Sequence, residues 1–240
     1  MLVIPVLDLK GGVVVHATGG DRARYAPINT PLAPGSADPV AICAGLLGVY
    51  PFMKMYVADL DAIAGGVPNR EAISATSSAL PDIELWVDDG RPPSAAHAAL
   101  PARRLRYVIG SETLGAMSGL FDAMPLGSPP AAARPGILSL DFRGDDFLGP
   151  PDLLARPNLW PETVIVMTLG RVGSGAGPDF ERLSGIIARA DGRQVIAAGG
   201  VRNVADLEAL AAIGVAGALV ATALHSGQIK AGDLERVAGL

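Results

Sequence analysis

The chain has little cysteine, few aromatic residues and little charge. Of its 240 residues, 1 is a cysteine, 5% are aromatic and 18% are charged. A single cysteine excludes an intrachain disulfide. The place of Cys43 in the apolar stretch "PVAICAGLLGVY" predicts a buried residue rather than a reactive thiol. The histidines lie far apart in the sequence and no cysteine–histidine cluster exists, so we expect no metal site.

Basic charge and long apolar runs are also scarce. The formal net charge is -5 at pH 7, which argues against a nucleic-acid surface or an anionic-membrane binder. No uncharged apolar run reaches the roughly 18 residues that a membrane span needs. The N-terminus lacks a basic region followed by an apolar stretch and a cleavage site. We therefore expect a cytoplasmic protein with no nucleic-acid and no membrane partner.

Short apolar runs recur along the chain and predict strands. They cover 2–8, 54–59, 83–88, 105–111, 136–141, 163–168, 194–200 and 217–222. Runs without polar alternation are typical of a parallel sheet covered on both faces. Amphipathic stretches that predict helices lie between several of them, at 38–50, 69–80, 179–190 and 203–214. Eight strands alternating with helices favour a single-domain α/β (β/α)8 barrel over residues 1–240 rather than an open doubly wound sheet.

The sequence also reads as two copies of one half-barrel, approximately residues 1–125 and 133–240. Asp8 matches Asp141, and three further pairs match at a nearly constant offset: Asp59 with Thr168, Gly90 with Gly200, and Ser111 with Thr222. An internal repeat of four βα units is the simplest explanation. The alternative is general similarity among βα units in a chain rich in alanine and glycine.

Two aspartates related by this repeat are candidates for acid–base chemistry. Asp8 and Asp141 end the first and fifth predicted strands, which lie opposite each other in a ring of eight. Carboxyl ends of barrel strands project into the face where active sites lie. Two carboxylates in different surroundings can serve as base and acid, which suits an aldose–ketose rearrangement. The alternative is that each aspartate only caps the turn that follows it.

A second candidate site is predicted for an anion. "AAGGVRN" at 197–203 and "VATALHSG" at 220–227 follow the last two strands, where barrels often bind phosphate. We expect phosphate contacts from Gly199, Gly200, Ala221 and Thr222, with a tight turn that binds no ligand as the alternative. In the first half-barrel, "VDDGRPP" puts Asp88 and Asp89 in the corresponding turn, where their charge repels phosphate. The twin site is therefore expected to be altered or lost.

One long loop, 19–36, follows the first strand region and contains "DRARY". Loops of this length are usually lids or irregular insertions. Its charged residues could lie over a ligand, and an irregular surface insertion is the alternative.

Several motifs resemble the HisA/HisF family of histidine biosynthesis over essentially the whole chain, with the HisA branch the more similar. They are "IPVLDLKGGVVVHATGGD", "VADLDAIAGG", "LSLDFRGD", "IAAGGVRNVADLEAL" and "GALVATALHSGQI". The resemblance implies a half-barrel-duplicated TIM barrel, an Amadori-type aldose–ketose isomerisation of a phosphorylated ribotide, and no cofactor. It implies Asp8 as general base and Asp141 as general acid, in a monomer or small homo-oligomer.

The resemblance also implies roles for further residues. These are Thr168 in catalysis; Lys10, His16, Asp59, Arg171 and Ser174 in substrate binding; and Gly177, Gly199, Gly200, Ala221 and Thr222 around phosphate.

The chain departs from the HisA pattern after the sixth strand and in the turn after the third. HisA-type enzymes carry Thr–acidic–x–x–x–Asp–Gly–Thr, whereas "MTLGRVGSGAGPD" has Met167 and Val172 at the threonine and aspartate positions. We therefore predict an isomerase that has diverged from true histidine biosynthesis. One alternative is a paralogue in methanopterin- or methanofuran-type one-carbon cofactor biosynthesis, since "VADLDAI" and "RVGSG" resemble a HisA-related group associated with those carriers. Another is a non-catalytic barrel that binds a phosphorylated metabolite.

Overall fold

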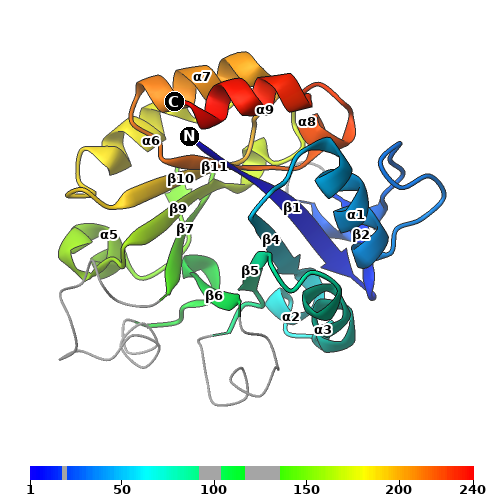
Figure 1. Cartoon of the computed structure of the whole chain (residues 1–240). Helices are drawn as coiled ribbons and strands as arrows, with labels where there is room; N and C mark the ends of the chain where they lie inside the picture. The colour runs from blue at the N-terminus through cyan, green and yellow to red at the C-terminus, as the bar shows by residue number, and fades with distance from the viewer. Residues whose placement is uncertain (18–20, 92–103, 117–135) are drawn as a thin grey trace.

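A closed barrel of eight parallel strands forms the centre of the molecule. The computed structural model describes residues 1–17, 21–91, 104–116 and 136–240. The barrel strands are β1 (Leu2–Lys10), β4 (Lys54–Asp59), β5 (Glu84–Asp88), β6 (Leu105–Gly110), β7 (Ile137–Arg143), β9 (Thr163–Thr168), β10 (Gln194–Ala198) and β11 (Gly217–Val220). The last strand, β11, pairs with β1 in parallel and closes the ring. The predicted (β/α)8 barrel is confirmed (Figure 1).

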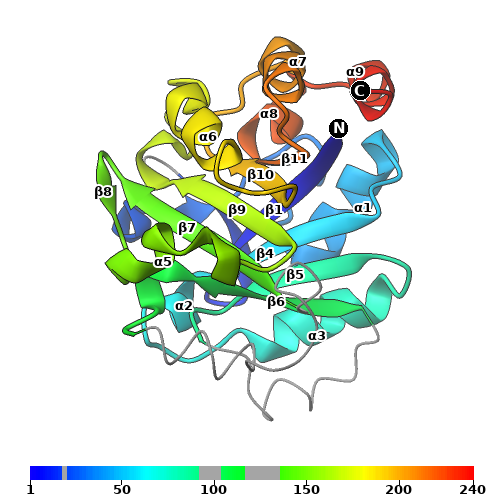
Figure 2. The same ribbon diagram turned by 90° about the vertical axis from the view of Figure 1, so that its left-hand side faces the viewer.

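Helices cover the outside of this barrel, as Figures 1 and 2 show from two directions. They are α1 (Pro39–Val49), α3 (Arg70–Ala79), α5 (Pro151–Ala155), α6 (Phe180–Ile187), α7 (Val204–Ala212) and α9 (Ala231–Ala238), while the one-turn helices α2 (Leu60–Ile63) and α8 (Thr222–His225) directly follow β4 and β11. The four predicted helices are present, and three begin at side-chain caps from Asp38, Asp179 and Asn203. Within the described ranges, no helix combines the length and apolar character needed to cross a membrane.

A hairpin continues the first strand beyond its predicted end. The sequence predicts a strand over 2–8, whereas β1 runs to Lys10 and turns back into β2 (Val13–His16). Gly11 and Gly12 form the turn with φ of 58° and 81°, a conformation that glycine adopts without steric cost. Three short strands pair antiparallel at the barrel rim: β2 with β1, β3 (Ala26–Pro27) with β2, and β8 (Asp146–Phe147) with β7.

Alternation along the strands separates an inner core from an outer core. Ile4 of β1, Trp86 of β5 and Ile165 of β9 belong to the cluster inside the barrel. Their neighbours along the strands, such as Leu7 and Val166, belong to the cluster between strands and helices. Because successive side chains of a strand point to opposite faces, every second residue faces the barrel interior. This parity also decides which polar residues at the strand ends reach the barrel mouth.

Strand β10 ends two residues earlier than predicted because of its glycines. We expect a strand over 194–200, but Gly199 and Gly200 have φ of 100° and 89°, and β10 stops at Ala198. A Cβ at Gly200 would lie 2.2 Å from the carbonyl oxygen of Gly177, and one at Gly199 would lie 2.7 Å from that of Thr168. Both positions therefore need glycine for close backbone packing as well as for conformation.

Gly200→Ala should lower the free energy of unfolding more than Gly214→Ala. Both glycines have φ of 89°, so both changes carry the same left-handed backbone penalty of about 1 kcal/mol. At Gly214 the nearest atom to an added Cβ is 3.9 Å away, so only Gly200→Ala adds a backbone clash. We expect the clash to cost a further ~1–3 kcal/mol in urea unfolding. Equal losses in the two variants would contradict the packing role.

Candidate active site

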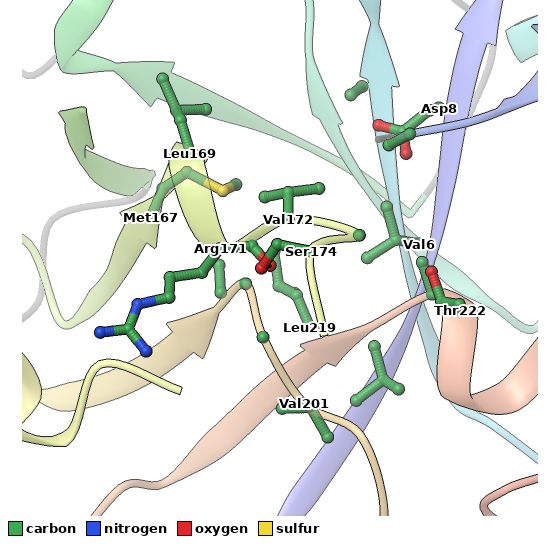
Figure 3. Close-up of a pocket in the computed structure, with 18 of the residues that line it drawn as sticks. Val6, Asp8, Met167, Leu169, Arg171, Val172, Ser174, Val201, Leu219 and Thr222 are labelled. Carbon is green, nitrogen blue, oxygen red and sulfur yellow. The ribbon is translucent and has the colours of Figure 1, made fainter. Parts of the chain in front are cut away.

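A cavity of about 410 Å³ opens at the carboxyl ends of the barrel strands. Its polar and charged lining residues include Asp8, Arg22, Tyr25, Tyr56, Asp88, Glu112, Asp141, Arg143, Arg171, Ser174, Arg202, Thr222, Ser226 and Gln228. Figure 3 shows Asp8 and Thr222 on one side of this cavity and Met167 and Leu169 on the other. The lining therefore combines an acidic region with an apolar one. Active sites of (β/α)8 enzymes lie at this end of the barrel.

Asp8 and Asp141 face this cavity from opposite sides of the ring. Asp8 lies on β1 and Asp141 on β7, which are four strands apart in either direction around the barrel. Burial raises the pKa of each carboxyl from 3.8 to about 7, and it is the largest cause in both cases. Arg22 acts against the shift at Asp8, while the charge of Asp88 adds to it at Asp141. Groups with pKa values near 7 can exchange protons at neutral pH.

Hydrogen bonding differs sharply between these two aspartates. Asp141 is 4% exposed and accepts bonds from the Ser139 hydroxyl at 2.6 Å, the Ser111 hydroxyl at 3.2 Å and the Glu112 backbone N–H at 3.0 Å. Asp8 is partly exposed to the cavity, and no donor among the described residues bonds its carboxylate. Donors favour the ionised form, so Asp141 is the better stabilised carboxylate in this respect.

A third carboxyl group, that of Asp88, lies at the end of β5 and lines the same cavity. It accepts a hydrogen bond from the Tyr56 hydroxyl at 2.9 Å and another from the Gly90 backbone N–H at 3.1 Å. Burial raises the pKa of Asp88 to about 6 despite these donors, and the charges of Glu112 and Asp89 add to the shift. Tyr56 faces all three carboxyls, since burial and then Asp88, Asp141 and Asp8 raise the pKa of its hydroxyl.

An ion pair joins the loop after β2 to the turn after β6. The Arg22 guanidinium lies 2.5 Å from the Glu112 carboxylate, and both residues line the cavity. Arg22 begins the short 3-10 helix η1 (Arg22–Arg24), which Asp21 caps through its side chain. Glu112 belongs to η2 (Ser111–Thr113). The described part of the loop predicted over 19–36 thus brings charge to the cavity; residues 19 and 20 lie outside the described residues.

Small residues after the last two barrel strands form part of the cavity lining. Gly199 and Gly200 after β10, and Ala221 and Thr222 after β11, line the cavity, and their predicted contact with phosphate stays a prediction. Ser226 and Gln228 add polar groups on this side. The acidic lining residues come from β1, β5, β7 and η2, and β1 lies beside β11, whereas the turn after β10 contributes no carboxylate, so an anion would meet less repulsion there.

Two predicted site residues are not brought to the cavity, because strand parity turns them outward. Asp59 shares the outward face of β4 with Val57, is 0% exposed and caps α2 by accepting the Ala62 N–H at 3.1 Å. Thr168 shares the outward face of β9 with Val166 and is 6% exposed, whereas Met167 faces the cavity. A direct contact with a ligand in this cavity does not fit Asp59 or Thr168.

Asp59 instead organises the loop that follows β4. Its carboxylate accepts the backbone and side-chain N–H groups of Asn69, both at 2.7 Å. The Asn69 side chain also donates to Asp61 at 2.9 Å. Asp61 and Asn69 in turn accept the backbone N–H groups of Gly11 and Gly12 at 2.6 and 2.7 Å. This network ties the tip of the β1–β2 hairpin to the neighbouring loop.

Three more predicted residues lie behind or beside the cavity. The Lys10 ammonium donates to the Arg22 carbonyl at 2.9 Å, so it supports the loop that carries Arg22. His16 is exposed at the end of β2, and Gly177 packs its backbone against Gly200. None of the three is among the residues that line the cavity. The structure therefore supports an indirect role for Lys10 and Gly177.

Arg171 and Ser174 do line the cavity, but both are engaged with their own loop. The Arg171 guanidinium donates to the carbonyl oxygens of Ala176 and Gly177, at 3.2 and 3.0 Å. Figure 3 shows its side chain directed away from Asp8. The Ser174 hydroxyl donates to the Arg171 carbonyl at 2.9 Å. The apolar side chains of Met167 and Val172, which replace the polar residues of the HisA pattern, line the cavity beside this loop.

The sequence pattern assigns no catalytic or binding role to Tyr56, Asp88 or Glu112. For Arg22 it predicts only that the charged loop could lie over a ligand. Tyr56 lies inside an apolar strand run, where a tyrosine reads as core. Asp88 is expected only to repel phosphate, although its position at a strand end resembles those of Asp8 and Asp141. Glu112 follows the fourth strand directly, and this position is the signal that could identify it.

No group of three or more histidine, cysteine, aspartate or glutamate side chains in the described ranges is placed to hold a metal ion. Cys43 is buried in α1 as predicted, and burial raises the pKa of its thiol to about 12. A neutral thiol is a poor nucleophile, so Cys43 fits a core role.

Comparisons with known proteins identify similar sequences. A family model described as histidine biosynthesis protein matches residues 158–230. An isomerase of Anaeromyxobacter sp., named 1-(5-phosphoribosyl)-5-((5-phosphoribosylamino)methylideneamino) imidazole-4-carboxamide isomerase, is 30% identical over 252 residues, covering 99% of both chains. The protein of the same name from Listeria monocytogenes is 29% identical over 247 residues, covering 99% of this chain and 98% of its own. An uncharacterized protein of Methanocaldococcus jannaschii is 25% identical over 238 residues, covering 99% and 97%.

Asp88→Asn should stabilise the protein at pH 8 and leave it nearly unchanged at pH 4. The Asp88 pKa is raised from 3.8 to about 6, so the folded state binds more protons than the unfolded state between these values. Stability from this group therefore falls as pH rises through that window. An asparagine can keep both contacts, because its oxygen accepts the Gly90 N–H and its amide donates to Tyr56.

We expect a melting temperature at least about 2 °C above that of the wild type at pH 8, measured by calorimetry. The exposed Asp82→Asn is the control for loss of one carboxylate and should not change the pH dependence. A larger loss of stability at pH 8 than at pH 4 would show that Asp88 stabilises the fold as a carboxylate.

Proposed function

Since the chain belongs to the histidine biosynthesis protein family, we propose that it is a phosphoribosyl isomerase-type enzyme that converts an aldose to a ketose by acid–base catalysis. Asp8 is the general base and Asp141 the general acid. The observation that carries this proposal is the pair of carboxyls that face one cavity from opposite strands, each with a pKa near 7. Matched values near neutral pH suit proton transfer in both directions.

The two aspartates suffice for an Amadori-type rearrangement. Protonated Asp141 gives its proton to the sugar ring oxygen as the ring opens to an iminium ion. Ionised Asp8 then removes the proton from C2 and leaves an enaminol. Asp8 returns a proton to C1 while Asp141 accepts the proton of the enol hydroxyl, which forms the ketone. Both groups end in the state in which they began, and no bond to the protein forms.

The substrate of this chain carries one phosphate in our proposal. The two isomerases named above act, by their printed name, on a molecule with two phosphoribosyl groups. Here Gly199 and Gly200 belong to a turn that contributes no carboxylate to the cavity, whereas Asp88 and Glu112 line it from the first half-barrel. A second phosphate there would be repelled by these groups, so a singly phosphorylated ribotide-like or sugar-like substrate fits better.

Two alternatives rest on the same departures. Met167 and Val172 make part of the cavity apolar where the HisA pattern has polar residues. This favours a changed reaction over histidine biosynthesis itself; that the changed reaction belongs to methanopterin- or methanofuran-type one-carbon cofactor biosynthesis rests only on the motif resemblance. The second alternative is a barrel that binds a phosphorylated metabolite without turning it over.

Asp8→Asn and Asp141→Asn should each lower kcat/KM by about 10²–10⁴-fold, the usual contribution of an acid–base group. The assay is isomerisation of the substrate of the named relatives and, in parallel, of singly phosphorylated ribosylamines. Asp145→Asn, at an exposed position in the β7–β8 hairpin, is the control and should keep full activity.

Melting temperatures should not fall in either active-site variant, because each replaces a buried acid whose charge opposes folding. Full activity in either variant would refute its role. If this gene allows a strain that lacks the histidine isomerase to grow without histidine, the protein catalyses the histidine reaction itself. No growth, together with stabilisation by singly phosphorylated sugars, would favour the changed reaction.

Crystals soaked in sulfate should hold one anion in the cavity, beside Gly200 and Thr222, and none beside Asp88. The glycines allow backbone N–H groups to approach, and the carboxylates repel a second anion. The measurement is the difference density in data from soaked crystals, with unsoaked crystals as the control. Two anions on opposite walls would overturn the single-phosphate proposal.

A further inference from the structure

The Arg22–Glu112 ion pair spans the mouth of the barrel between the two aspartates. Its partners are 90 residues apart in sequence, and the guanidinium and carboxylate approach to 2.5 Å. Lys10, two residues after Asp8 on β1, holds the Arg22 carbonyl at 2.9 Å. The Glu112 backbone N–H donates to the Asp141 carboxylate at 3.0 Å. Each end of the ion pair is thus tied to a strand that carries one of the aspartates.

The hydrogen bonds around the two aspartates favour the wrong protonation pattern for the proposed reaction. Asp141 accepts bonds from Ser139, Ser111 and the Glu112 N–H, which favour its carboxylate form. Asp8 has no such donor among the described residues, so burial favours its neutral form. On these contacts alone, Asp8 would be the acid and Asp141 the base.

We propose that Arg22 and Glu112 are positioning residues that offset this preference, with the cation favouring ionised Asp8 and the anion favouring protonated Asp141. The assignment of base and acid rests on the proposed function, whereas the electrostatic effect on each aspartate does not. Neither residue needs to touch the reacting atoms, because the ion pair acts through the field at the two carboxyls.

The charges on the cavity walls agree with this direction. Arg22 lowers the pKa of Asp8, and Glu112 raises the pKa of Asp141 and of Asp88. With both charges present, Asp8 and Asp141 reach the same value of about 7 in spite of their unequal hydrogen bonds. Arg22 and Glu112 are 31% and 17% exposed at their side chains, so solvent screens them only in part.

Other charged and titratable groups at the mouth do not replace this ion pair. The charge of Asp88 raises the pKa of Asp141 more than that of Glu112 does, so Glu112 adds to an effect already present, and Tyr56 faces all three carboxyls. Lys10 is directed to the Arg22 carbonyl, Arg171 to its own loop and Arg202 to Asp206. Arg143 follows Asp141 on β7 and is exposed at the rim.

The test measures the titration of each aspartate directly, by carbon-13 NMR of labelled aspartate carboxyls, and needs no substrate. Coupling between the two sites is removed by following Asp8 in the Asp141→Asn protein and Asp141 in the Asp8→Asn protein. Adding Arg22→Gln should raise the Asp8 midpoint by about half a pH unit or more. Adding Glu112→Gln should lower the Asp141 midpoint by about the same amount.

Two controls separate charge from disturbance of the fold. Arg22→Lys keeps the charge and should restore most of the Asp8 midpoint. Arg236→Gln breaks an exposed ion pair on α9 and should move neither midpoint. Unchanged midpoints, or shifts in the opposite directions, would overturn the proposal. Shifts as expected in a protein that isomerises no phosphorylated sugar would leave the electrostatic effect standing and refute the proposed function alone.

Discussion

The cost of burying carboxyl groups governs the chemistry at the mouth of this barrel. Asp8, Asp88 and Asp141 come from three strands and meet one cavity, and loss of hydration raises the pKa of each toward neutrality. Rigid strands hold these groups together although their charges repel one another. The neighbouring hydroxyls and backbone N–H groups moderate the cost without removing it.

Much of this arrangement can be predicted from the sequence, because it depends on local patterns. Apolar runs predict all eight barrel strands, and their ends identify Asp8 and Asp141 at the cavity. Asp59 and Thr168 also end strands, yet they point outward because of the two-residue alternation. Ala58 faces inward and Val166 faces outward, so counting in steps of two from such a residue separates the inward strand ends from the outward ones.

Contacts between distant segments cannot be predicted in this way. The pairing of Arg22 with Glu112 depends on how a loop after β2 folds over the ring, and no local pattern encodes that path. The same holds for Gly177, whose carbonyl packs against Gly200 from a different βα loop. The glycines after β10 indicate an anion cradle in the sequence, and the structure adds that the backbone crossing requires them. Close backbone packing and anion binding are compatible at these positions, since both need a residue without a side chain.

The hydrogen-bond network around Asp59 connects the outward face of β4, which does not line the cavity, with the loops around the cavity. Through Asn69 and Asp61 it fixes the tip of the β1–β2 hairpin, whose strand carries Lys10 and, through it, the Arg22 carbonyl. The buried Asp59 side chain therefore helps to fix the position of the loop that carries Arg22. Replacement of Asp59 would disturb a loop at the cavity, although Asp59 itself does not line the cavity. Kinetic defects in this family of barrels need a structural control of this kind before a binding role is assigned.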